Sequence, residues 1–509
     1  MFENQPKALY ALALANTGER FGYYTMIAVF SLFLRANFGL SGDTAGLIYG
    51  VFLALVYFLP LVGGIMADKF GYGKMVTIGI IVMFAGYLFL SIPLGGGVMG
   101  YAAMFGALLL VSLGTGLFKG NLQVMVGNLY DAPELSAKRD SGFSIFYMAI
   151  NIGALFAPTA AVKIRDWAEV SLGYSGNDAY HFSFAVACVS LIVSMMIYYA
   201  FRSTFKHVEA GAGKSKKTDT AGTEEELTPQ QTKERIVALC LVFAVVIFFW
   251  MSFHQNGLTL TFFADEFVSP KSEGVQTMAF DVINLVMIIF MIYSLMSFFQ
   301  SKTSKAKLIS TVVFLAAVGV LVYKYHNIGG PVDVSAPIFQ QFNPFYVVAL
   351  TPVSMAIFGA LAAKGKEPKA PRKIAYGMII AGCAYLLMVL ASRGLLTPNA
   401  QAAAKAAGET VPFASGNWLI GTYLILTFGE LLLSPMGISF VSKVAPPKYK
   451  GAMMGGWFVA TAIGNLLVSV GGFLWNDIPL TVVWSVFIIL CFISAGFMFL
   501  MMKRLEKVA

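Results

Sequence analysis

An acidic and a basic residue stand side by side in the middle of the first long apolar segment. Glu19 and Arg20 interrupt the run ALALANTGERFGYYTMIAVF, whose length and apolar flanks are typical of a transmembrane helix. A charge at the centre of a bilayer costs about 3 kcal/mol or more, so it is rarely kept there without a partner and a task. The pair therefore indicates a polar site inside a membrane.

Two further charges, Lys119 and Glu430, fall inside other apolar runs. Together with Glu19 and Arg20 they make a set of two anions and two cations, whose charges sum to zero. The first segment also places polar side chains at the spacing i, i+3, i+4, i+7 and i+8, which is one face of a helix. These residues are Asn16, Glu19, Arg20, Tyr23 and Tyr24. One polar stripe on a membrane helix predicts one polar cavity.

Each of these side chains also has a structural interpretation. Glu19 and Arg20 could form an ion pair that only neutralises itself, and Glu430 could bridge two helices. Tyr147 and Asn151, at i and i+4, could make interhelical hydrogen bonds. Lys119 is harder to explain in this way, because no acidic residue lies within a turn of its own helix. The aromatic candidates, which could serve only packing or the membrane interface, are Tyr23, Tyr24, Tyr57, Trp250 and Trp457.

The composition indicates that these residues are positioned by transmembrane helices. Of the 509 residues, 58% are hydrophobic and 12% are charged, and the mean hydropathy of +0.74 is that of a polytopic membrane protein. Apolar stretches of about 20 residues predict fourteen transmembrane helices. They begin near Ala8, Thr44, Met75, Tyr101, Gly142, Phe182, Ile236, Met278, Leu308, Pro344, Ile374, Trp418, Gly451 and Thr481.

The distribution of Lys and Arg predicts the topology. Most of the 35 basic residues fall in loops on one side, including 202–235 and 364–373, and the positive-inside rule places that side and both termini in the cytoplasm. The rule also accounts for the net charge of +9, so we expect no nucleic-acid partner. The four cysteines lie in apolar spans without metal-ligand spacing, so we expect neither a metal nor disulfides.

The long polar segment 202–235 divides the spans into six before it and eight after it. Two six-helix bundles joined by a cytoplasmic linker is the arrangement of the major facilitator superfamily, in which the site lies between the halves. We therefore expect an all-α membrane fold with bundles at 1–201 and 236–509. The two extra helices are expected to form an inserted hairpin at about 278–325.

The segment after the second span fits the same superfamily. Gly64, Asp68, Lys69 and Gly71 follow the pattern G-x-x-x-D-K-x-G, which resembles the gating-loop signature of major facilitators. A tight turn with charges at a helix end would show the same glycines.

Several motifs carry a closer resemblance. The first span reads N-T-G-E-R-F-G-Y-Y, the fourth contains GTGLFKGNLQ and the fifth FSIFYMAINIGALFAP. They resemble E-x-x-E-R-F-x-Y-Y, G-x-G-x-x-K-P-N and F-Y-x-x-I-N-x-G of the proton-dependent oligopeptide transporter family. Weaker matches follow in the same order in the second half: FFWMSFHQNG, QQFNPF, YLILTFGELLLSPMGISF and GGWFVATAIGN.

The resemblance implies a secondary transporter of the bacterial inner membrane that imports di- and tripeptides by proton symport through alternating access. A short peptide is a zwitterion, so Arg20 and Lys119 would hold its carboxylate and Glu430 would attract its amine. Asn151 and Asn343 would bind the peptide backbone. The pockets would be lined by Tyr23, Tyr24, Tyr57, Tyr147, Trp250, Ser434 and Trp457. Its partners would be peptides, protons and the lipid bilayer. The proton gradient would supply the driving force, so we expect no cofactor. We also expect a monomer.

The chain departs from the family at the residues implied in proton coupling. Asn16 stands where the family has its first acidic residue, which leaves Glu19, Arg20, Lys119, His254 and Glu430 as coupling candidates. His254 occupies a position where bacterial members often have a carboxylate. It could relay protons near neutral pH or be a neutral, hydrogen-bonded core histidine.

The resemblance also allows solutes other than peptides. A family member could carry another anionic or zwitterionic solute, such as nitrate or a modified amino acid, or could be weakly coupled to protons. We expect no enzyme, because no intramembrane nucleophile with its base or metal cluster is evident. A primary pump would carry a phosphate-binding G-x-x-x-x-G-K-[ST] loop, and the chain has none.

Overall fold

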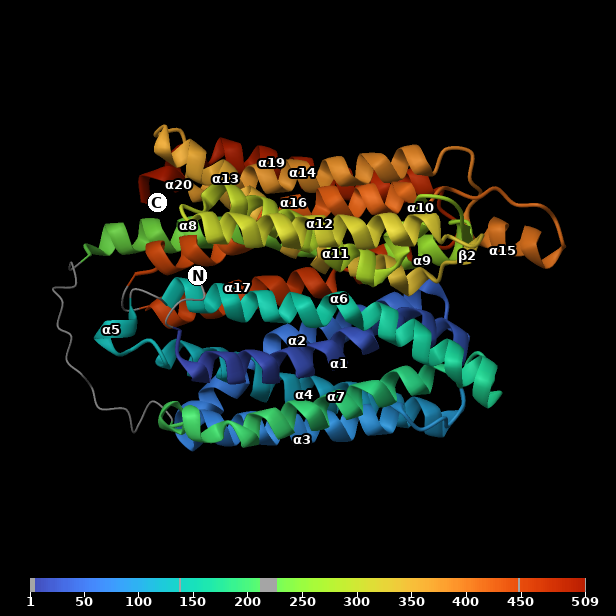
Figure 1. Ribbon diagram of the computed structural model, residues 1–509, viewed down its shortest axis with the longest axis horizontal. Coiled ribbons are helices and arrows are strands. Elements are labelled where there is room, and N and C mark those ends of the chain that lie inside the picture. The colour runs from blue at the N-terminus through green and yellow to red at the C-terminus, as the bar shows by residue number, and fades with distance from the viewer. Residues whose placement is uncertain (1–4, 137–138, 211–226, 447–448, 509) are drawn as a thin grey trace.

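The computed structural model describes residues 5–136, 139–210, 227–446 and 449–508, and it is almost entirely helical (Figure 1). The helices of the first part are α1 (Lys7–Phe38), α2 (Gly42–Phe70), α3 (Tyr72–Leu90), α4 (Val98–Asn128), α5 (Pro133–Ser136), α6 (Arg139–Leu172) and α7 (Tyr180–Ala200). Two single turns, η1 (Arg202–Thr204) and η2 (Lys206–Val208), follow them.

The second part begins with a helix in two pieces, α8 (Pro229–Phe253) and α9 (Thr259–Glu266), which are joined by η3 (His254–Gly257). It continues with α10 (Gln276–Phe280), α11 (Val282–Gln300), α12 (Ser304–His326), η4 (Ala336–Gln341), α13 (Phe342–Ala363), α14 (Ala370–Ala391) and α15 (Pro398–Ala406). The last helices are α16 (Asn417–Val444), α17 (Lys450–Leu466), α18 (Ser469–Phe473), α19 (Leu480–Leu500) and α20 (Met502–Val508). The strands β1 (Lys271–Ser272) and β2 (Val332–Asp333) pair antiparallel, with Lys271 opposite Asp333.

Within the described residues, 13 helical segments are long and apolar enough to cross a membrane. Helix α1 adds a further span: its 32 residues rise about 48 Å at 1.5 Å each, more than the roughly 30 Å of a bilayer core. Its polar stripe lowers its hydropathy below that of the others. The predicted spans are confirmed to within about four residues at their starts, with two exceptions. The helix predicted near Ile236 already begins at Pro229, and Met278 lies in the separate short helix α10.

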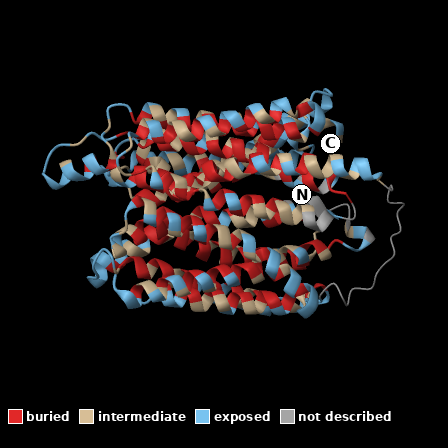
Figure 2. Ribbon diagram, turned by 180° about the vertical axis from the view of Figure 1, so that it is seen from behind, coloured by how far each residue is buried: buried red, intermediate tan, exposed pale blue. Residues whose placement is uncertain are grey.

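The helices pack as two groups, α1 to α7 and α8 to α20, seen as the lower and upper halves of Figure 1. In the first group α1 packs against α6 and α7, and α4 packs against α2 and α3. In the second group α14 packs against α16 and α19. Buried residues concentrate between helices, and exposed ones lie on the outer surfaces and at the ends (Figure 2). Large apolar side chains stay exposed on the outside, as expected for helices that face lipid.

The predicted hairpin corresponds to α11 and α12, which pack against each other. Only 11% of the most apolar stretch of α12 is buried, so most of its surface is available to lipid. Asp281 caps the first turn of α11 through the Ile283 amide and forms an ion pair with Lys324 of α12. The Asp281 carboxylate is therefore paired within the hairpin itself.

Candidate functional site

The site begins at an interruption of the seventh span, between α8 and α9. The turn η3 leaves backbone carbonyls without helical partners, and in a membrane such groups must be satisfied by protein. Gln255 donates its amide to the Met251 and Val468 carbonyls at 3.2 and 3.0 Å, and Tyr423 donates to the Asn256 carbonyl at 3.0 Å. Buried side chains thus stabilise a broken helix, the kind of element that forms solute sites in transporters.

Glu19 and Arg20 form a two-pronged ion pair on α1. The Arg20 Nε and Nη2 atoms donate to the two Glu19 oxygens at 2.5 and 2.6 Å, and both residues are buried. The guanidinium also lies 4.6 Å from the centre of the Tyr23 ring. A guanidinium has five N–H donors, so the pair leaves Arg20 with further donors for another anion. Both Glu19 oxygens, in contrast, are already occupied.

Lys119 is the second cation of the first half. Its Nζ atom lies 4.0 Å from the centre of the Tyr57 ring, and it is close enough to Arg20 and Glu19 for their charges to interact. Within the described residues, no carboxylate lies within ion-pair distance of this half-buried ammonium. Arg20 and Lys119 together therefore form a cationic region that only Glu19 partly neutralises.

Glu430 lies opposite, on α16 of the second half. The Asn343 amide of α13 donates to the carboxylate at 2.9 Å and to the Thr427 hydroxyl at 3.0 Å, which fixes the carboxylate at the interface between the halves. Glu430 is 8% exposed, and its charge acts on Tyr24, Tyr57 and Tyr147 of the first half. The anionic side of the site thus faces the aromatic residues that border the cationic side.

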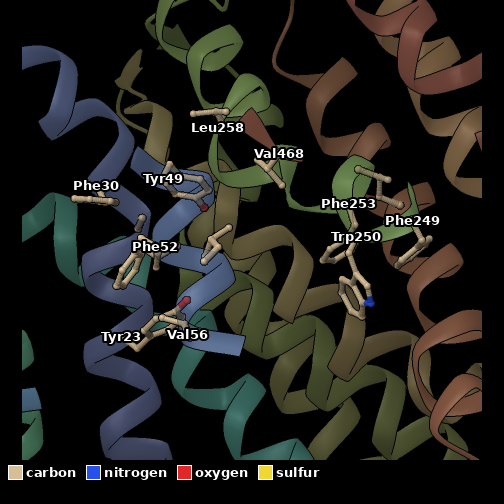
Figure 3. Close-up of a cluster of buried hydrophobic side chains, with 14 of the residues drawn as sticks. Tyr23, Phe30, Tyr49, Phe52, Val56, Phe249, Trp250, Phe253, Leu258 and Val468 are labelled. Atoms are coloured by element: carbon tan, nitrogen blue, oxygen red, sulfur yellow. The ribbon is translucent and has the colours of Figure 1, made fainter. Parts of the chain in front are cut away.

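His254 lies at the break itself. Its Nδ1 atom is 2.5 Å from the Oδ1 atom of Asn465 on α17, and its ring stacks on Trp250 with centroids 5.1 Å apart. Its ring centre is 6.0 Å from that of Tyr57 across the interface. Figure 3 shows Trp250 beside Phe249 and Phe253 on α8, and Tyr23 on the other half.

Water reaches part of this site. Tyr147 on α6 is 46% exposed even though Glu430, Tyr24 and Tyr57 lie within electrostatic reach of its ring. Asn151, one turn further along α6, is buried and donates its amide to the Tyr147 carbonyl at 3.1 Å. Tyr147 therefore combines an exposed ring with electrostatic neighbours in both halves.

Two predicted pocket residues are not tied to this set by any described contact. Ser434 is half-buried on α16. Trp457 on α17 is buried against Gly437 of α16, where a Cβ atom would lie 1.9 Å from the indole ring. Sequence reasoning missed Asn465, Thr427 and Gln255, although the motif GGWFVATAIGN ends on Asn465 and Thr427 precedes Glu430 by one helical turn.

The expected gating loop is helical for most of its length. Gly64, Asp68 and Lys69 lie in the last turns of α2, and only Gly71, with φ of +97°, begins the turn into α3. The apolar run before Asp68 continues the helix, and the positive φ requires glycine at its end. The Tyr72 hydroxyl donates to Asp68 at 2.7 Å. The segment expected as a loop is therefore mostly the end of a helix.

The two halves are joined at the end of the molecule opposite the termini (Figure 1). Arg35 of α1 forms an ion pair with Glu266 of α9, and the Trp475 indole donates to the same carboxylate at 3.2 Å. Helix α2 packs along α17 and α18, where a Cβ atom on Gly46 would lie 3.0 Å from Gly472. These contacts hold the two halves together at this end.

The comparisons with known proteins agree with this geometry. The model of the POT family matches residues 73–222 and 324–482. The chain belongs to the POT family. It is therefore a multi-pass membrane protein of a transporter family, and the recognition drawn from the motifs is confirmed.

Two bacterial relatives align over most of the chain. The chain is 27% identical to dipeptide and tripeptide permease B of Xenorhabdus bovienii, over 92% of this chain and 86% of that protein. It is 29% identical to the uncharacterized transporter YclF of Bacillus subtilis, over 99% of this chain and 95% of that protein. Among solved structures, the peptide transporter POT in complex with sulfate matches with a TM-score of 0.73 at 22% identity, covering 100% of this chain and 96% of that one. The predicted major facilitator fold is confirmed.

Proposed function

We propose that this POT-family protein imports di- and tripeptides into the bacterial cytoplasm by symport with protons. The observation that carries the proposal is the separation of charge between the halves. Arg20 and Lys119 supply cations on α1 and α4, and Glu430 supplies an anion on α16. A short peptide carries a carboxylate at one end and an ammonium at the other, so it can pair with both sides at once.

The fixed geometry favours the termini and backbone of the peptide over its side chains. Asn343 orients Glu430, and Glu19 orients Arg20, so the two poles are preorganised. The surrounding walls are aromatic and include Tyr24, which makes them tolerant of different side chains. We therefore expect broad acceptance of sequence and strict dependence on length.

The charge separation also couples binding to movement of the halves. A bound dipeptide pulls the first and second halves together, because each half holds one of its ends. We take 1–201 and 236–509 as the moving units, joined by the linker 202–235. Because one chain carries both poles, a monomer in the inner membrane, with both termini in the cytoplasm, is sufficient for transport.

The proposal is tested by uptake of labelled dialanine and trialanine into proteoliposomes, with and without an inward proton gradient. Uptake that the gradient stimulates supports both parts of the proposal. Uptake that is indifferent to the gradient would contradict symport and leave peptide transport intact. Absence of both uptake and competition would point instead to another anionic or zwitterionic solute.

A further inference from the structure

A cavity of about 420 Å³ lies at the end of the molecule opposite the termini, bordered by α1, α9 and α15. Its volume falls within the range of roughly 300–1,000 Å³ that is typical of small-molecule sites. None of its lining residues belongs to the charged site around Arg20, Lys119 and Glu430. It is lined from the first half by Arg35, Gly39 and Tyr180, among others, and from the second half by Asp265, Asn399 and Lys405. This α15 cavity therefore exists only while the two halves are together at this end.

Helix α15, which forms one wall of the α15 cavity, is fixed in place by hydrogen bonds (Figure 1). The buried Gln401 amide and the Lys405 ammonium donate to the Glu266 carbonyl of α9 at 3.2 and 2.8 Å. The Asn399 amide donates to the Asp477 carboxylate, in the segment before α19, at 2.7 Å. These bonds attach α15 to two separate parts of the second half, so the wall is a built feature of the fold.

The α15 cavity has one anion and one cation that are open to a ligand. Arg35 and Glu266 neutralise each other in an ion pair. Asp265 is exposed, and its carboxylate has no hydrogen bond or ion pair with any described residue. Lys405 has three N–H donors and uses one on the Glu266 carbonyl. The charges of Asp265 and Lys405 act on each other, yet the two groups are not within ion-pair distance.

This arrangement favours a ligand that carries both charges. Arg165 of α6 also acts on Asp265, but it is engaged by the Asp166 carboxylate and the Tyr180 hydroxyl. A simple anion would leave Asp265 unpaired, and a simple cation would leave Lys405 without a carboxylate. A zwitterion pairs with both at once. The two ends of a dipeptide are about 7 Å apart at roughly 3.3–3.6 Å for each residue, which suits two groups that are near but do not touch.

We propose that the α15 cavity is a second binding site for a zwitterion of dipeptide size, with its carboxylate on Lys405 and its ammonium on Asp265. The inference rests on the proposed peptide import for the identity of the ligand and for the placement of this end outside the cell. A ligand that binds only while the halves are together shifts the population toward that state. Occupation of the α15 cavity therefore holds this end closed.

Protection from a thiol reagent measures the second site without any transport. Ala402 lines the α15 cavity, and Ala403 is an exposed neighbour on the same helix that does not line it. Ala402→Cys and Ala403→Cys are each labelled with a maleimide in lipid nanodiscs, where both faces of the protein are accessible. The four native cysteines lie in membrane-spanning helices, and their labelling in the unmodified protein is subtracted. Dialanine should slow the labelling of Ala402→Cys and leave that of Ala403→Cys unchanged.

Substitutions in the Ala402→Cys protein show which groups hold the ligand. Lys405→Met should raise the dialanine concentration for half-protection about fivefold, as expected for a charge that water partly screens. Lys405→Arg keeps the charge and should restore protection. Lys271→Met is the matched control, because Lys271 is an exposed lysine on β1 that does not line the α15 cavity. N-acetyl-dialanine and dialanine amide each lack one charge and should protect less than dialanine.

Glu430→Gln separates the second site from the site between the halves. In the Ala402→Cys protein it should leave the half-protection concentration unchanged. If Glu430→Gln shifts protection as much as Lys405→Met does, dialanine acts from the other site and the inference is wrong. Equal labelling of Ala402→Cys with and without dialanine would also overturn it, as would equal protection by the two blocked peptides. Protection without any dialanine uptake would refute the proposed import while supporting the second site.

Transport supplies an independent readout. Because dialanine in the α15 cavity holds this end closed, uptake into proteoliposomes should pass through a maximum and then fall as dialanine is increased on this side. Lys405→Met should remove the fall, and Lys271→Met should keep it. A simple saturation curve for the unmodified protein, up to concentrations that give full protection of Ala402→Cys, would contradict the closing effect.

Discussion

Replacing Glu430 by glutamine isolates the charge that we assign to the peptide amine. Glutamine keeps the length of the side chain, and its carbonyl oxygen can still accept the Asn343 amide at the position where Glu430 now accepts it at 2.9 Å. The substitution therefore removes the negative charge while keeping the hydrogen bond that orients the group. Its effect on binding measures the charge and not a loss of packing.

The expected loss follows from the burial of the carboxylate. Glu430 is 8% exposed, so solvent screens it little, and a hydrogen bond to a charged group contributes about 1.5–3 kcal/mol. At about 1.4 kcal/mol for each factor of ten, the dissociation constant of dialanine should rise about 10- to 100-fold. N-acetyl-dialanine has no ammonium group, so its dissociation constant should change by less than about threefold.

Titration calorimetry of dialanine and N-acetyl-dialanine with the unmodified protein and with Glu430→Gln gives four binding free energies. Together they make a double-mutant cycle between the Glu430 charge and the peptide amine. A coupling energy near the full loss for dialanine confirms the contact between Glu430 and the amine. Equal weakening of the free and the acetylated peptide would refute the reasoning, because the carboxylate would then act on the site as a whole.

Two other substitutions follow from the same geometry. Lys119→Met keeps an unbranched side chain of similar length beside Tyr57. It should weaken the binding of dialanine more than the binding of dialanine amide, which has no C-terminal carboxylate. Equal losses of affinity in calorimetry would count against a contact between Lys119 and the peptide carboxylate. Arg35→Glu should open the end opposite the termini by repelling Glu266, and the exchange Arg35→Glu with Glu266→Arg should close it again. Accessibility of a cysteine introduced at Tyr24 to an impermeant thiol reagent measures the opening, and a double variant as accessible as the single one would contradict the assignment.

The sequence was sufficient for most of the spans, for physical reasons. Hydropathy over about 20 residues is a local property, so the start of most spans could be located within a few residues. The stripe that includes Asn16, Glu19 and Arg20 follows from helical spacing alone. Glu19 and Arg20 are buried as an ion pair, as expected for charges inside a membrane segment.

The remaining features depend on contacts between distant segments. The sequence FHQNG did not reveal that α8 stops at Phe253, because the break is stabilised by Gln255 and Tyr423 through tertiary hydrogen bonds. Asn465 lies 211 residues from His254, so no local pattern could pair them. Helix α15 was also unexpected: Gln401 anchors it to the Glu266 carbonyl, a contact set by the fold of the end opposite the termini.

The central claim is that one peptide is held by its two ends between the two halves. A structure of the protein determined with bound dialanine tests it most directly. The account predicts that the peptide carboxylate lies within hydrogen-bond distance of Arg20 or Lys119 and that the ammonium lies beside Glu430. A peptide bound in the reverse direction, or held by one half alone, would contradict the account.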